Sequence, residues 1–77
     1  MNMEKAIEIV EGFITRLNRE LDENRASYAR TKADSIFDAD YRRMLENIHN
    51  RTMSKLIVLE DVKRALDVAM MDEEAKA

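Results

Sequence analysis

The sequence predicts an all-α protein, in which a long two-helix hairpin assembles into a homo-oligomeric helical bundle. The 77-residue chain contains no proline and a single glycine, the two residues that most often mark turns and interrupt helices. Apolar residues recur at steps of three and four along two long segments, which is the period of an α-helix. The second segment is apolar on more than one side, which indicates that more than one helix covers it. One domain, residues 1–77, is expected.

The first predicted helix spans about residues 3–28. Asn2 is a suitable N-cap, because its side-chain oxygen can accept a hydrogen bond from a free backbone N–H of the first turn, and Glu4 complements the helix dipole. The apolar stripe of this segment consists of Met3, Ile7, Val10, Ile14, Leu17 and Leu21. We therefore expect one face of the first helix to be buried.

Residues 29–34 carry no apolar stripe, and we expect a turn there. Ser35 and Asp38 follow with the spacing of a capping box. In that motif the serine hydroxyl accepts the backbone N–H three residues on, and the acidic side chain reaches back to the backbone N–H of the serine. The second helix is therefore expected to begin at about residue 36.

The second predicted helix spans about residues 36–71, and residues 72–77 are expected to form an acidic, frayed tail. The phase of its apolar stripe does not jump, which favours one continuous helix about 50 Å long. The stripe is weakest at residues 49–55, so a third helix would result from an interruption there. The members of the stripe are Phe37, Tyr41, Met44, Leu45, Ile48, Thr52, Lys55 or Leu56, Leu59, Val62, Leu66, Ala69 and Met70.

A small chain of this kind is expected to need a partner subunit. At 9.0 kDa, a single chain buries only a modest fraction of its unfolded surface. It contains no cysteine, so disulfides cannot stabilise it, and association is the remaining common route. A dimer that forms a four-helix bundle is the simplest expectation. The predicted oligomer interface consists of Leu56, Ile57, Leu59, Val62, Leu66, Val68 and Met70.

The composition argues against several classes of function. The formal net charge is −3 and the pI is about 5.1, whereas proteins that coat nucleic acids carry a strong basic excess. No apolar run approaches the roughly 18 residues of a membrane-spanning helix. Residues 1–5 lack the pattern of a secretory signal. We therefore expect a cytoplasmic protein that binds no membrane, and nucleic acid is not the expected partner.

The Glu-x-x-His motif of the sequence does not predict a metal site. Glu46 and His49 have the Glu-x-x-His spacing with which some four-helix proteins bind two irons. However, Leu45 and Ile48 occupy the inward arc of the helix, so Glu46 is expected to point outward and His49 to lie on the flank. Neither a metal nor any other cofactor is expected.

The sequence also offers no catalytic constellation. Asp38 and Asp40 could act as an acid and a base, but acidic residues in a first turn also complement the helix dipole. With one glycine there is no glycine-rich phosphate loop. Ser27, Ser35 and Ser54 have no base at a recognisable spacing. We therefore expect a protein that is not an enzyme.

The main functional hypothesis is a protein-binding adaptor or inhibitor that docks on a larger protein through exposed helix faces. It is motivated by apolar residues that lie off the main stripe, Ile57, Val58 and Val68, and by a basic group around residues 42–51. The alternative is a helical oligomer that captures a small anionic molecule, such as a nucleotide, at its subunit seams. The contacts for either partner would be Tyr41, Arg42, Arg43 and Arg51.

Residues 50–66 carry a second alternative. Arg51, the apolar run 57–59, the acidic pair Glu60-Asp61 and the later Ala65-Leu66 follow one another in that order. This segment resembles the end of a histone fold, which has a basic loop, a short apolar stretch and an acidic pair that opens a short final helix. The resemblance implies a DNA-binding dimer.

Overall fold

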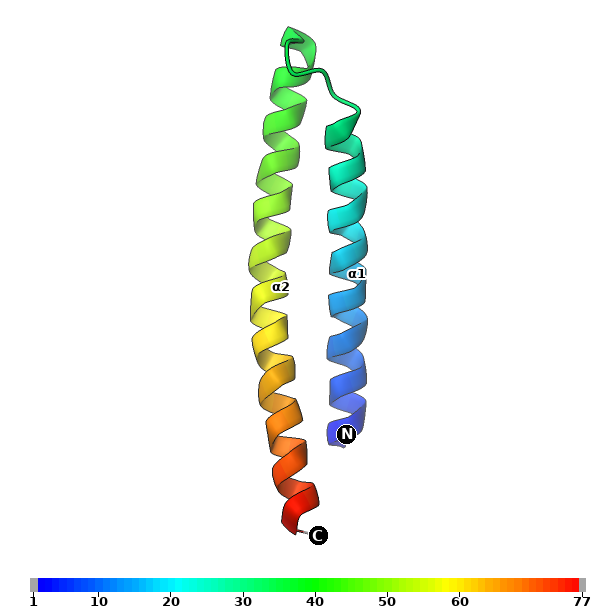
Figure 1. Ribbon diagram of the computed structural model, residues 1–77, viewed down its shortest axis with the longest axis vertical. Helices are drawn as coiled ribbons and strands as arrows, with labels where there is room; N and C mark the ends of the chain where they lie inside the picture. The colour runs from blue at the N-terminus through cyan, green and yellow to red at the C-terminus, as the bar shows by residue number, and fades with distance from the viewer. Residues whose placement is uncertain (1, 77) are drawn as a thin grey trace.

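The chain folds as two antiparallel helices that lie side by side (Figure 1). In the computed structural model, which describes residues 2–76, α1 spans Met3–Ala29 and α2 spans Ile36–Lys76. Both ends of the chain lie at one end of the hairpin, and the connection forms the tip at the other end (Figure 1). These observations confirm the predicted all-α hairpin.

The molecule is long and thin. Its extents are 62 × 16 × 14 Å, and its radius of gyration is 17.8 Å. A compact domain of this length has a radius of gyration of about 11–12 Å. The hairpin therefore exposes more of its surface to water than a compact fold of the same mass.

Helix α1 begins at the expected cap and ends without a glycine. The Oδ1 atom of Asn2 accepts a hydrogen bond from the backbone N–H of Lys5 at 2.8 Å. At the other end, the Thr31 hydroxyl donates to the carbonyl oxygen of Tyr28 at 2.7 Å, and the Thr31 N–H donates to the same oxygen at 3.0 Å. These bonds satisfy a free C-terminal carbonyl, and no described residue needs a positive φ angle.

The cap of α2 is half of the predicted capping box. The Oγ atom of Ser35 accepts the backbone N–H of Asp38 at 3.3 Å, as predicted. The Asp38 carboxylate, however, accepts the backbone N–H of Lys32 at 2.7 Å and not that of Ser35. The physical reason is that the Ser35 N–H already donates to the carbonyl oxygen of Lys32 at 3.1 Å. Asp38 therefore ties the connection to the first turn of α2.

Helix α2 is continuous through residues 49–55 and runs for 41 residues. It also continues through Lys76, beyond the predicted end at residue 71. Residues 72–76 contain neither glycine nor proline, and glutamate, alanine and lysine all favour the helix. No residue there interrupts the backbone hydrogen bonds, so the predicted fraying is absent from the part of the tail that is described.

The core is a narrow seam between the two helices. Its centre is formed by Leu17 and Leu21 of α1 with Leu56 of α2, and Ile14, Met53 and Leu59 pack against them. Leu45 and Thr52 are buried along the same seam. Positions that are at least half-buried recur at alternating steps of three and four, which gives a seven-residue repeat.

The predicted stripe of α2 is therefore broader than the face that α1 covers. Leu45, Thr52 and Leu56 lie in the seam, whereas Tyr41 and Met44 are exposed beside it. A single neighbouring helix covers only the two seam positions of each repeat. Other members of the predicted stripe, Phe37, Tyr41, Met44 and Val62, stay exposed to water.

Candidate protein-interaction surfaces

The predicted interface residues fall into two groups. Leu56 is buried in the core of the hairpin, and Leu59, Leu66 and Met70 are half-buried along the same seam. These four side chains are therefore already covered within the hairpin. The structure leaves Ile57, Val62 and Val68 exposed on α2.

One flank of the hairpin carries apolar side chains from both helices. A shallow groove there is lined by Phe13, Arg16, Leu17 and Glu20 of α1 and by Ser54, Lys55, Val58 and Leu59 of α2. Ile9 precedes Phe13 by four residues and Val62 follows Val58 by four, so both lie on the same flank. We call Ile9, Phe13, Val58 and Val62 the apolar flank; all four are exposed. The Arg16 guanidinium lies over the Phe13 ring, 4.8 Å from its centroid.

A second apolar surface lies at the tip of the hairpin. Ile36 is 89% exposed and Phe37 is 94% exposed in the first turn of α2. Arg42 stacks on Tyr28 near the end of α1, so Phe37 lies more than one helical turn beyond that level. Sequence reasoning placed Phe37 in the buried stripe. The unequal lengths of the helices could have revealed this overhang, because the shorter α1 cannot cover both ends of α2.

The predicted anion-binding residues do not converge. The Arg42 guanidinium lies 4.5 Å from the centroid of the Tyr28 ring, and its Nε atom is buried without a hydrogen-bond partner in the described chain. Arg43 pairs with Asp40 at 3.3 Å on the surface. Successive residues point about 100° apart on a helix, and Arg51 lies more than two turns further on. The three arginines therefore form no common pocket, and Tyr41 is exposed separately.

The Glu-x-x-His pair also forms no metal centre. The Tyr28 hydroxyl donates a hydrogen bond to Oε1 of Glu46 at 3.0 Å, and Glu46 is exposed as predicted. His49 is half-buried and lines a shallow pocket with Asn24 and Arg25. Within residues 2–76, no group of three or more potential metal ligands is placed to hold an ion.

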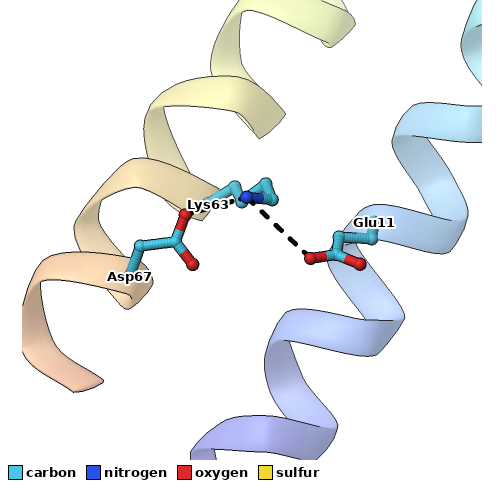
Figure 2. Close-up of polar contacts among 3 residues, drawn as sticks. All are labelled: Glu11, Lys63 and Asp67. Carbon is cyan, nitrogen blue, oxygen red and sulfur yellow. Dashed lines mark hydrogen bonds and ion pairs between the residues drawn. The ribbon is translucent and has the colours of Figure 1, made fainter. Parts of the chain in front are cut away.

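Lys63 connects the two helices near the open end of the hairpin (Figure 2). Its Nζ atom lies 2.8 Å from Oδ2 of Asp67 and 3.8 Å from Oε1 of Glu11 in α1. The hydrogen bond to Asp67 and the negative charge of Asp67 are the main causes that raise the pKa of Lys63. Desolvation opposes them with a smaller effect, and the charge of Glu11 adds the smallest increase. Lys63 was not assigned to the seam from the sequence. The signal was its seven-residue spacing from Leu56 and Met70, which places it in the seam.

The segment that resembles the end of a histone fold lacks the loop that the resemblance implies. Residues 50–66 lie inside the continuous helix α2. Over the residues described, neither helix has an apolar stretch long enough to cross a membrane. No protein-family model, curated protein or solved structure matches this chain.

Proposed function

We propose that this chain is a non-enzymatic helical binding protein, an adaptor or inhibitor that docks on a larger protein through the tip of its hairpin. The exposure of Ile36 and Phe37, adjacent in the first turn of α2, carries this proposal. Single exposed apolar residues are common on protein surfaces, but two large neighbours at 89% and 94% exposure are not. Burying a phenylalanine side chain contributes about 1.5–3 kcal/mol.

The local backbone supports a role as an anchor. Ser35 caps the first turn of α2, and the Asp38 carboxylate holds the backbone N–H of Lys32 at 2.7 Å. The two apolar side chains therefore extend from a turn that is already fixed by hydrogen bonds. A preorganised anchor loses less conformational entropy when it binds, so more of its burial energy appears as affinity.

The ionisable residues support binding and not catalysis. Five of the six ion pairs in the described chain join residues three or four positions apart on the same helix. Four of these five are well exposed, as the pair of Arg64 with Asp61 is. Such pairs are typical of a solvated helix surface. Pairs of this kind stabilise the helices and do not by themselves position an acid and a base for catalysis.

The test compares three baits in a quantitative pull-down. These are the wild-type chain, Phe37→Asp at the tip, and Val68→Asp as a matched control on an exposed apolar residue of α2 far from the tip. We expect a partner protein that is retained by the wild type and by Val68→Asp and is lost with Phe37→Asp. Equal recovery with all three baits, or no retained protein, would contradict docking through the tip.

A further inference from the structure

The two flanks of the hairpin differ in chemistry. The apolar flank exposes large side chains of both helices, among them Phe13 and Val58. The opposite flank carries charged groups, including Arg25 and Glu46 around one shallow pocket and Glu60 and Arg64 around another. Charged groups remain in water at low cost, whereas a row of exposed apolar groups favours burial. Only one flank is therefore suited to pack against another helix pair.

The exposed area is sufficient for a stable interface. The accessible surface of the chain is 6044 Å². A compact monomer of 9.0 kDa exposes about 4,850 Å². The excess is roughly 1,200 Å², which exceeds the roughly 800 Å² that each partner contributes to a standard stable interface. Burying about 800 Å² on one flank would remove about two thirds of this excess.

Arg16 of α1 stacks on Phe13 within the apolar flank, and beyond it, towards the tip, the charges have opposite signs on the two helices. Towards the tip, α1 continues with Glu20 and Glu23, and α2 continues with Lys55 and Arg51. All four are exposed. Within the described chain, no ion pair joins either acid to either base. Their charges are therefore free to pair with another molecule that presents the complementary pattern, and a second copy of this chain presents it.

The charge pattern also distinguishes the two symmetric arrangements. A two-fold axis along the hairpin lays α1 of one copy on α2 of the other, so that Phe13 faces Val58 and Glu20 faces Lys55. A two-fold axis across the hairpin lays α1 on α1 and α2 on α2, and it does not bring Glu20 against Lys55 of the other copy. Opposite charges attract and like charges repel across an interface, which favours the first arrangement.

We infer that the apolar flank binds a second copy of this chain, in a two-fold symmetric four-helix bundle whose hairpin tips lie at the same end. Each α1 packs on the partner's α2, and every neighbouring pair of helices is antiparallel. The bundle leaves Phe37 beyond the end of α1, so a dimer presents two tips on one side. Self-association through this flank does not depend on the adaptor function.

The first experiment measures mass in solution by light scattering for the wild type, Val58→Asp and Ile57→Asp. Val58 and Ile57 are matched, because they are adjacent, β-branched and 60% and 55% exposed, but they lie on opposite flanks. We expect a mass of two chains for the wild type and Ile57→Asp. Val58→Asp should raise the dissociation constant by about 100-fold or more, because it buries an unpaired charge. A wild-type mass of one chain, or equal behaviour of the two variants, would overturn the inference.

The second experiment uses a chain that keeps its interface intact and therefore does not depend on how Val58→Asp folds. The natural sequence has no cysteine, so Ala33→Cys in the exposed connection gives one spin label per chain. With both tips at one end, the label-to-label distance in the dimer should be within about 30 Å, since packed helices lie 8–10 Å apart. A distance near the 62 Å length of the molecule, or no dipolar signal, would overturn the inference.

The third experiment tests the charge pairing. In one double variant, Glu20→Lys and Glu23→Lys make the flank basic; in the other, Arg51→Glu and Lys55→Glu make it acidic. Each alone should dimerise at least 10-fold more weakly than the wild type, and mixing the two should restore a mass of two chains. Failure of the mixture to associate would place these charges outside the interface.

Discussion

The side-chain amide of Asn24 in α1 donates a hydrogen bond to the backbone carbonyl oxygen of Leu45 in α2, with an N···O distance of 3.0 Å. Asn24 follows Leu21 by three residues and occupies a half-buried position of the seam. The bond joins two fixed points on the helices, so sliding one helix by a turn breaks it. The contact between Lys63 and Glu11 has the same property near the other end. Leucine packing between them is less selective for register.

Asn24→Leu should stabilise the hairpin and loosen its register. A leucine in the seam gains apolar burial, whereas the Leu45 carbonyl keeps its place in the helix of α2. We expect the free energy of unfolding in urea to rise by about 1 kcal/mol, because a buried asparagine specifies register at a cost in stability. The amide NMR spectrum should broaden or show extra peaks. A single sharp spectrum would contradict the role of Asn24 in register.

Leu56→Ala should destabilise the fold far more than Ile57→Ala. Leu56 is buried with Leu17 and Leu21, whereas the adjacent Ile57 is exposed. Removing a buried leucine side chain costs about 2–5 kcal/mol, whereas an exposed substitution changes stability by about 0.5 kcal/mol or less. Urea unfolding monitored by circular dichroism measures both. Similar losses for the two variants would mean that the seam is assigned to the wrong face of α2.

The period of the apolar residues predicted both helices, but the stripe that it predicted on α2 is broader than the side that faces α1. Thr52 and Lys63 lie in the seam although they are polar, and Tyr41 and Met44 lie outside it although they are apolar. Hydrophobicity alone therefore widens the predicted stripe beyond the true seam and omits Lys63 from it. The sharper signal is the alternation of three- and four-residue steps across both helices, which the polar residues share. The exposed tip could not be predicted from the stripe, because exposure there depends on where α1 ends.

Asp38→Ala should weaken the start of α2. The substitution removes the 2.7 Å hydrogen bond from the Lys32 N–H and an acidic group from the first turn. Losses of helix-cap contacts typically cost about 1 kcal/mol. Asp40→Ala is the matched control, because Asp40 makes an exposed ion pair with Arg43 and such pairs contribute little. Hydrogen exchange of the residue 32 amide should accelerate only in Asp38→Ala. Equal exchange in both variants would show that the Asp38 contact does not hold the connection.

The ion pairs of Lys63 should make the hairpin lose stability in alkaline solution. Asp67 and Glu11 raise the pKa of Lys63 above its ordinary value of 10.5 in the folded chain. A group whose pKa is raised by folding contributes stability in full below its unfolded pKa, and the contribution is lost as the pH rises through the folded pKa. We therefore expect the melting temperature of the wild type, relative to that of Lys63→Met, to be constant up to about pH 9 and to fall by about pH 12. The comparison with Lys63→Met removes the titration of the tyrosines and of the other lysines. Lys32→Met is the control, because Lys32 is exposed and its side chain forms no ion pair within the described chain. Its difference from the wild type should vary less with pH, and a steeper fall for Lys32→Met than for Lys63→Met would contradict the assignment.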